Sequence, residues 1–286
     1  MASAKDYLTE VRIQDSYKNL LILLAPFFGK KLFVFNYYPS LILGFLALFL
    51  NSSTCYIIND IKDAPLDAHH PKKKQRPIAS GKIGKLSAFS FSLILISVSL
   101  LISYSLGTNF LILSFLLFLN SLAYTVFLRE ILWLDLVSVS LNYIIRALAG
   151  CEIVNVSVSP WLLMGVFYIS MVLVLAKRRE ELVTLVKPEL HRKAFKHYTI
   201  SLIDQTISIF STLILISYSL YTFHSPYANS LLPFTIPIVT LIMLQFITAS
   251  KNTGETGIIR KILSNRIMVA SLLIWIIIMV YLIYGM

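Results

Sequence analysis

The sequence has little charge, few acidic residues and almost no cysteine. Only 14% of its 286 residues are charged, 57% are hydrophobic, and the mean hydropathy is +0.77. Ordinary soluble proteins carry about 25% charged residues, so this composition excludes a soluble globular protein. The two cysteines, Cys55 and Cys151, fall in or at the edge of apolar runs. Nothing in their placement indicates a disulfide or a metal pair.

Several other features are missing. The start of the chain carries charges where a signal peptide needs its apolar core, so we expect residues 1–18 to be a retained cytosolic segment. No long repeat and no low-complexity segment occurs. The net charge is +11, yet the basic residues lie in short loops and form no extended basic surface. We therefore expect no nucleic-acid partner.

Long apolar runs dominate what is present. A helix needs roughly 20 apolar residues to cross a bilayer, and scanning with that length predicts nine membrane-spanning helices. Pro26 and Gly29–Lys30–Lys31 interrupt the first. The connections are short, so we expect an all-α integral membrane bundle, with one domain over 1–286. The predicted spans are 19–35, 38–60, 84–105, 108–128, 131–150, 160–180, 199–222, 230–250 and 266–285.

The basic residues predict the orientation. With the N-terminus inside, the inner segments and adjoining span ends hold 22 of the 25 Lys and Arg residues. Lys30 and Lys31 lie on the other side, and Arg146 lies within a span. Positively charged loops stay in the cytoplasm. We therefore expect a multi-pass plasma-membrane protein with a cytoplasmic N-terminus and cytosolic cap loops at 61–83 and 181–198.

The densest charge follows the second apolar run, in NDIKDAPLDAHHPKKKQRPIASG (59–81). On a helix continuing from that run, Asn59, Asp63 and Asp67 stack at i, i+4 and i+8, and Asp60 shares their face. Like charges at this spacing repel each other. Oxygen ligands suit Mg²⁺ that is shared with a phosphate group, so we predict a magnesium site here. The alternative is a solvated acidic face.

Basic residues follow these carboxylates within a few positions, with Lys73 and Arg76 among them. Carboxylates that hold Mg²⁺ beside basic groups suit a substrate that is itself a polyanion. The lysines could instead serve only the topology. Arg76, which precedes Pro77, is the stronger candidate for a direct substrate contact.

A second charged cluster, LAKRREEL (175–182), ends the sixth run. Its Lys177 and Glu181 are spaced i, i+4, and a simple surface pair of that kind contributes about 0.2–0.5 kcal/mol. The loop that follows occupies an inner position like that of the first cluster. We therefore expect both clusters to surround one cytosolic cavity.

Polar residues also lie near or within the spans. Lys18 and Asn19 open the first span, Tyr124 is near the end of the fourth, and Arg146 and Asp204 lie deeper. An ionisable residue inside a span is by default a functional-site hypothesis. Arg146 and Asp204 could alternatively neutralise each other across helices.

Together these motifs resemble the UbiA superfamily of intramembrane prenyltransferases. NDIKDAPLD matches its N-D-x-x-D-x-x-x-D motif, and the most similar branch is that of the decaprenyl-phosphate phosphoribosyltransferases. The other matching stretches are RIQDSYKNLLILLAP (12–26), HHPKKKQRPIASG (69–81), IIRALAG (144–150), SPW (159–161), AKRREEL (176–182) and HRKAFKHYT (191–199).

The resemblance implies nine helices around a cytosol-facing cavity that is open to lipid. It implies Mg²⁺-dependent transfer of the 5-phosphoribosyl group from phosphoribosyl diphosphate to a polyprenyl phosphate, with release of pyrophosphate. Ordinary members of the superfamily carry a second aspartate-rich motif and transfer a prenyl group from its diphosphate to an aromatic or lipid acceptor. Here the second motif is basic, which favours the phosphoribosyl branch.

This hypothesis assigns roles to particular residues. A polyprenyl phosphate is already ionised near neutral pH and needs no general base, which fits the lack of a convincing His or Ser nucleophile. A prenyltransferase, a transporter for an anionic lipid or metabolite, and a non-catalytic membrane scaffold stay as alternatives, and a homo-oligomer is possible. The expected Mg²⁺ ligands are Asn59, Asp60, Asp63 and Asp67; the expected catalytic residues are Asp63, Lys177 and Glu181; and the expected substrate-binding residues are Lys18, Asn19, Lys73, Arg76, Tyr124, Arg146 and Arg178.

Overall fold

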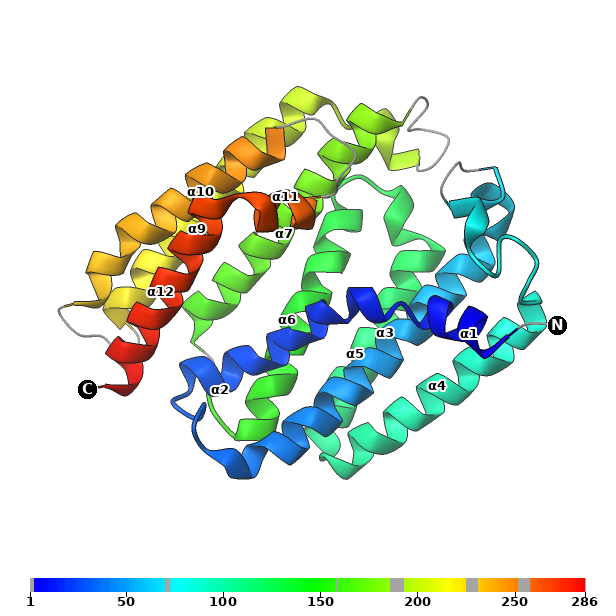
Figure 1. The fold of residues 1–286 in the computed structure, drawn as a ribbon, viewed down its shortest axis with the longest axis horizontal. Coiled ribbons are helices and arrows are strands. Elements are labelled where there is room, and N and C mark those ends of the chain that lie inside the picture. Colours follow the sequence, from blue (N-terminus) through cyan, green and yellow to red (C-terminus); the bar gives the residue numbers. More distant parts are fainter. Residues whose placement is uncertain are drawn as a thin grey trace. The chain divides into compact units, whose positions relative to one another are not determined.

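The computed structural model describes residues 3–69, 73–157, 159–185, 193–224, 231–251 and 258–285, and all regular secondary structure in these ranges is helical (Figure 1). Eight of its helices are long and apolar enough to cross a membrane, and they coincide with eight of the nine predicted spans. Parts of the predicted cap loops, 70–72 and 186–192, lie outside the described residues. The eight helices are α3 (Tyr38–Asp67), α4 (Lys85–Ser105), α5 (Thr108–Val126), α6 (Leu134–Val154), α7 (Pro160–Thr184), α9 (Ile200–His224), α10 (Ile236–Lys251), which spans together with the preceding 3₁₀ helix η6 (Leu232–Thr235), and α12 (Arg266–Tyr284).

The ninth span, expected over 19–35, is not confirmed as a continuous helix. A 3₁₀ helix, η1 (Ile13–Leu23), leads into the short α2 (Leu24–Phe28), which contains Pro26. A 3₁₀ helix rises about 2.0 Å per residue against about 1.5 Å in an α-helix. The 11 residues of η1 and 5 of α2 therefore cover roughly 30 Å, about the thickness of a bilayer core.

The described residues group into two compact units. The first contains α1 (Ala4–Val11), η1, α2 to α5 and residues 141–157. The second contains residues 129–140, α7, α9, α10, α11 (Ile258–Ser264) and α12. Helix α6 therefore begins in the second unit and ends in the first. A single domain over the whole chain stays a prediction.

In the first unit small and polar residues face the interior. On α4, Ala88, Ser92 and Ser99 are buried, whereas Ile94 and Leu101 are exposed. The Ser99 hydroxyl donates to the Ala47 carbonyl oxygen on α3 at 2.7 Å. Small residues at helix contacts with large apolar ones outside are the pattern of helices surrounded by lipid.

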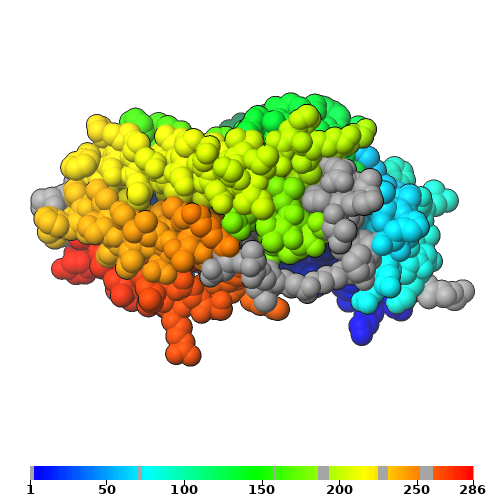
Figure 2. Space-filling view, turned by 90° about the horizontal axis from the view of Figure 1, so that it is seen from above, coloured from blue at the N-terminus to red at the C-terminus, as the bar shows by residue number. Residues whose placement is uncertain are grey.

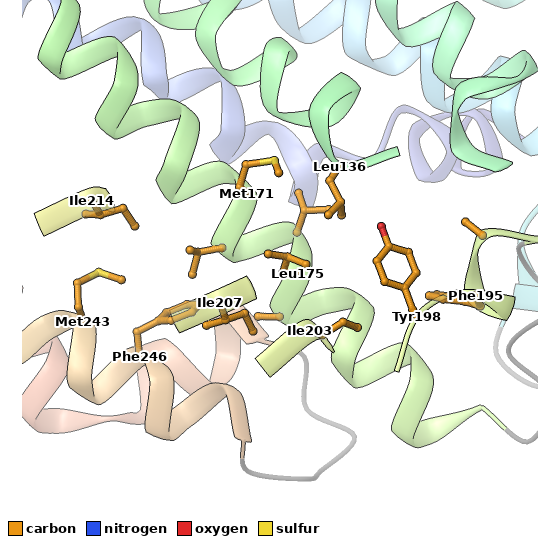
Figure 3. Close-up of a cluster of buried hydrophobic side chains, with 14 of the residues drawn as sticks. Leu136, Met171, Leu175, Phe195, Tyr198, Ile203, Ile207, Ile214, Met243 and Phe246 are labelled. Atoms are coloured by element: carbon orange, nitrogen blue, oxygen red, sulfur yellow. The ribbon is translucent and has the colours of Figure 1, made fainter. Parts of the chain in front are cut away.

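The second unit is held by a buried apolar cluster that joins its helices (Figure 3). Helix α7 contributes Met171 and Leu175, α9 contributes Ile203 and Ile207, and α10 contributes Phe246. Figure 2 shows α9 (yellow) beside α10 (orange), and these two helices are in contact. This cluster packs against the C-terminal half of α7, the helix that carries the second charged motif.

Candidate functional site

The acidic motif lies on α3, as the sequence predicts. This helix runs for 30 residues, through Pro65, so its apolar segment and the motif belong to one helix. Asp60 and Asp67 are buried, whereas Asn59 and Asp63 are half-buried. The Asn59 side-chain nitrogen donates to the Asp63 carboxylate at 2.9 Å. All four predicted ligands therefore come from one stretch of a single helix.

Arginine side chains neutralise the buried carboxylates. Arg76 Nη1 lies 3.0 Å from Asp60 Oδ1 and 2.6 Å from Asp67 Oδ2, so it bridges the two carboxylates. Lys73 Nζ lies 3.7 Å from Asp67 Oδ1. Arg76 and Lys73 are therefore brought to the acidic motif, as predicted. Charge-assisted bonds of this kind offset the repulsion between the aspartates.

Sequence reasoning missed Arg12. Its guanidinium donates to Asp60 Oδ1 at 2.6 Å and lies 5.0 Å above the Tyr56 ring. The residue stands at the junction of α1 and η1 with a φ of 54°, which is uncommon for a residue other than glycine. The available signal was its place as the first residue of the 12–26 motif.

Glu10 is a second residue that the sequence did not reveal. Its carboxylate accepts a hydrogen bond from the Ile78 backbone N–H at 3.0 Å, which ties α1 to the loop after the acidic motif. Burial and the neighbouring Asp60 raise the pKa of Glu10 to about 7. Nothing in its sequence context distinguishes it from an ordinary helix residue.

The acidic motif fits Mg²⁺ in one particular mode. Among the described residues, no three His, Cys, Asp or Glu side chains are grouped so that they could hold a metal by themselves. Mg²⁺, however, is usually bound through one or two carboxylates together with waters and substrate phosphates. The half-buried Asp63 with Asn59 fits that shared mode. Which of the four residues would hold the ion stays a prediction.

A buried arginine lies deeper in the first unit. Arg146 on α6 is 5% exposed, and its Nε donates to Asn19 Oδ1 at 2.7 Å. Its two terminal nitrogens donate to the Asn142 carbonyl oxygen and to the Ser52 hydroxyl, at 2.7 and 2.9 Å. The structure thus brings together two of the predicted substrate-binding residues, Asn19 and Arg146.

Lys18 lies beside this group. Its Nζ is 3.3 Å from the Tyr56 hydroxyl and 3.6 Å from Asp15 Oδ1. The Lys18 ammonium also lies 5.7 Å from the centre of the Tyr56 ring. Tyr124 is half-buried on α5, and its part in a site stays a prediction.

In the second unit, Arg178 belongs to a buried network. Its Nε donates to Asp135 Oδ2 at 3.0 Å, and its Nη1 donates to Glu181 Oε2 at 3.0 Å. The Tyr198 hydroxyl donates to the other Asp135 oxygen at 2.8 Å, and in Figure 3 it points toward the start of α6. Asp135 is 0% and Arg178 is 2% exposed. This network joins α6, α7 and the segment before α9.

The next residue, Arg179, is also paired. Its Nε donates to Asp204 Oδ1 at 2.7 Å, and its Nη1 donates to the Ser250 and Lys251 carbonyl oxygens at the end of α10. Asp204 is thus paired with Arg179 within the second unit, whereas Arg146 has its hydrogen-bond partners within the first.

The remaining predicted residues of the second cluster lie on α7. Lys177 is exposed and Glu181 half-buried. Because Arg178 and Arg179 are both paired with carboxylates, the cluster offers less positive charge than the letters KRREE indicate. That the two charged clusters face one cavity stays a prediction.

Comparison with known proteins places these features in a family context. Residues 23–253 match the model of the UbiA prenyltransferase family. A decaprenyl-phosphate phosphoribosyltransferase of Mycolicibacterium smegmatis is 31% identical over 78% of this chain and 71% of that protein. The protein of the same name from Corynebacterium glutamicum is 26% identical over 96% of this chain and 86% of that protein.

Solved structures show the same fold. A UbiA homolog from Archaeoglobus fulgidus, bound to GPP and Mg²⁺, superposes with a TM-score of 0.73 at 14% identity, over 97% of this chain and 98% of that one. At this identity the likeness concerns the fold alone. It confirms the expected helical membrane architecture without fixing a substrate.

Proposed function

Because the chain belongs to the UbiA prenyltransferase family, we propose that it transfers the 5-phosphoribosyl group from phosphoribosyl diphosphate to a polyprenyl phosphate, releasing pyrophosphate. Two relatives that align with most of the chain are named decaprenyl-phosphate phosphoribosyltransferases, which supports this assignment. The structural observation that carries it is the acidic motif enclosed by Arg12, Arg76 and Lys73. Carboxylates interleaved with cations suit a donor that carries several phosphates.

The donor diphosphate lies at the acidic motif. A bound Mg²⁺ supplies charge neutralisation on the diphosphate, and Asn59, Asp60, Asp63 and Asp67 are the residues that would hold it. Arg76 bridges Asp60 and Asp67, and in our proposal it exchanges one of these carboxylates for a phosphate oxygen of the donor. The cation is thus already beside the place where the leaving group gathers negative charge.

The chemical step is a substitution at the anomeric carbon. An oxygen of the polyprenyl phosphate forms the new bond to that carbon, and the bond to the diphosphate oxygen breaks. The acceptor oxygen carries its negative charge beforehand, so no residue has to remove a proton. Lys177 and Glu181 at the end of α7 are the proposed contacts to the donor, with Asp63 at the metal.

Arg178 takes a different role from the one its sequence position indicates. Its burial with Asp135 and Tyr198 makes it a positioning residue, which holds the end of α7 where Lys177 and Glu181 project. Arg178 is 2% exposed and already binds Asp135 and Glu181, so we assign the direct donor contact to the exposed Lys177 instead.

The chain is a multi-pass membrane protein, and we assign it to the plasma membrane with a cytoplasmic N-terminus. The excess of Lys and Arg in the predicted inner segments supports this orientation. Phosphoribosyl diphosphate is water-soluble, so a site at the cytosolic rim gives the donor access while the lipid acceptor enters from the bilayer.

Donor choice separates this function from its main alternative. Pairing of Arg178 and Arg179 makes the second cluster less basic, and this favours an ordinary prenyltransferase using a prenyl diphosphate. Purified protein is incubated with Mg²⁺, farnesyl phosphate as acceptor and phosphoribosyl diphosphate as donor, and the molecular mass of the lipid product is determined by mass spectrometry. A parallel reaction contains geranylgeranyl diphosphate with an aromatic acceptor.

The proposal predicts a lipid product heavier than the acceptor by one phosphoribosyl group. A prenylated aromatic product in the parallel reaction, with no phosphoribosylated lipid in the first, would assign the alternative function. The Asp63→Asn variant is the control in both reactions.

A further inference from the structure

The buried Arg146 has no carboxylate partner among the described residues. Its three hydrogen bonds go to Asn19 Oδ1, the Asn142 carbonyl oxygen and the Ser52 hydroxyl, which are all neutral acceptors. A guanidinium has five N–H donors, so these bonds use three of them. Buried charges in proteins are normally paired, because desolvating an unpaired charge is expensive. The other arginines described above differ, since Arg12 and Arg178 are each bound to a buried aspartate.

The neighbouring Asn19 has an unused donor. Asn19 is 1% exposed, and its Nδ2 is a buried nitrogen without a hydrogen-bond partner among the described residues. The orientation of the amide is set by its neighbour, because Arg146 Nε requires an acceptor and finds it in Asn19 Oδ1. Leaving such a donor unsatisfied costs about 1–3 kcal/mol. A ligand with acceptor oxygens removes this cost.

Lys18 is the chain neighbour of Asn19, and Tyr56 lies about one turn after Ser52 on α3. The Lys18 ammonium is 3.3 Å from the Tyr56 hydroxyl and 5.7 Å from the centre of its ring. Asp15 is the one carboxylate described near Lys18, at 3.6 Å, and it does not touch Arg146. The group therefore combines two positive charges, one carboxylate and an unused amide donor.

We propose that Lys18, Asn19 and Arg146 form a phosphate monoester site that is separate from the metal–diphosphate site. A phosphate monoester supplies the negative charge that Arg146 lacks and an acceptor for Asn19 Nδ2. Arginine and lysine together are the usual partners of phosphate oxygens. This inference deepens the proposed function, on which it rests for the identity of the phosphate, because both substrates carry one: the donor at its 5-position and the lipid at its head.

Helix α3 sets the spacing between the two sites. Ser52, which binds Arg146, and Asp60, which binds Arg12 and Arg76, are two turns apart on α3, with Tyr56 between them. At about 1.5 Å per residue these positions are roughly 12 Å apart along the axis. One diphosphate is too short to occupy both sites, so the deeper site takes another phosphate group.

Binding is measured without turnover, so that it is independent of the proposed reaction. The purified full chain in detergent, with EDTA and no Mg²⁺, is titrated by calorimetry with ribose 5-phosphate and separately with farnesyl phosphate. Ribose and farnesol are the phosphate-free controls. The test variant is Asn19→Asp, which keeps the acceptor for Arg146, removes the N–H donor and adds a competing negative charge.

The matched control is Asn36→Asp, which makes the same substitution at an exposed position of the first unit. Arg146→Gln is the second variant, which removes the unpaired charge. Thermal unfolding of each variant checks the fold, and Asn19→Asp is expected to unfold at or above the wild-type temperature because its carboxylate pairs with Arg146.

We expect one of the two phosphate probes to bind the wild-type protein. Its affinity for Asn19→Asp and for Arg146→Gln should be at least about tenfold lower, a difference of about 1.4 kcal/mol in binding free energy. Asn36→Asp is expected to bind as wild type does. Loss of ribose 5-phosphate binding assigns the site to the donor, and loss of farnesyl phosphate binding assigns it to the acceptor.

Two results would overturn the inference. One is equal affinity of wild type and both test variants for the probes, and the other is no binding of either probe to wild type. Failure of phosphoribosyl transfer in a separate assay, with phosphate binding still dependent on Asn19, would reject the proposed function and leave this site standing.

Discussion

Replacing Asp135 by asparagine should unfold the second unit at a lower temperature without abolishing donor binding. The substitution keeps the shape of the side chain and removes the charge opposite Arg178, which is 2% exposed. Removing one partner of a buried ion pair costs about 3–5 kcal/mol. Arg178 then loses its buried partner and keeps its bond to the half-buried Glu181. The Tyr198 hydroxyl donates to Asp135 Oδ1 in the wild type and can donate in the same way to the side-chain oxygen of the introduced asparagine.

The expected effect is large enough to measure directly. A chain of this size loses roughly 2–4 °C in Tm per kcal/mol, so the loss should be about 6–20 °C in detergent. The double variant Asp135→Leu/Arg178→Met removes both charges, and apolar replacement of a whole buried pair is often neutral or stabilising. It should therefore recover most of the lost Tm.

Donor kinetics in Arg178→Met discriminate the two possible roles of this arginine. A positioning role predicts a lower Tm for the single variant and near wild-type KM for the donor in the double variant. The contrary result is an unchanged Tm for Arg178→Met together with a raised donor KM in this variant and in Asp135→Leu/Arg178→Met. Arg178 would then contact the substrate, and its role in positioning the end of α7 would be refuted.

Three further results are expected. Arg76→Gln removes the cation that bridges two aspartates and should raise the donor KM at least about tenfold, as steady-state kinetics would show; an unchanged KM would contradict the exchange of Arg76 onto phosphate. Gly150→Ala places a Cβ 2.2 Å from the Ile22 carbonyl oxygen and should lower stability by about 1–3 kcal/mol in thermal unfolding, whereas Gly165→Ala, with open space around it, should not. Because the pKa of Glu10 is raised from 4.5 to about 7, the folded state binds its proton more tightly, so stability should fall as pH rises from about 4.5 through 7. The free energy of unfolding of Glu10→Gln should not fall across this pH range. If the variant shows the same fall as the wild type, Glu10 is not the group that causes it.

Much of the fold follows from features that a sequence displays locally. Eight apolar runs appear as eight helices because hydrophobic length alone selects a membrane span. The 19–35 segment differs: the sequence displays Pro26, but it does not display the long 3₁₀ stretch before it, which packs against α3 and passes close to Gly150. Close backbone approach of this kind leaves no periodic signal.

The candidate site was predictable where spacing alone brings residues together. Asn59, Asp60, Asp63 and Asp67 share a helix, so their common location follows from the period of 3.6 residues. The hydrogen-bond partners of the two buried arginines could not be predicted from spacing, because they are distant in the chain. Asn19 is 127 residues from Arg146, and Asp135 is 43 residues from Arg178. For the same reason the KRREE letters indicated a basic site, whereas the two arginines are paired in the folded unit.

The most direct test of the central claim follows the donor label into lipid. Purified protein is incubated with Mg²⁺, a polyprenyl phosphate and phosphoribosyl diphosphate radiolabelled in the ribose, and label in the organic phase is counted. We expect transfer that EDTA abolishes and that the Asp63→Asn variant lacks, while this variant keeps the wild-type unfolding temperature. No labelled lipid across several acceptor chain lengths, or undiminished transfer by Asp63→Asn, would contradict the account.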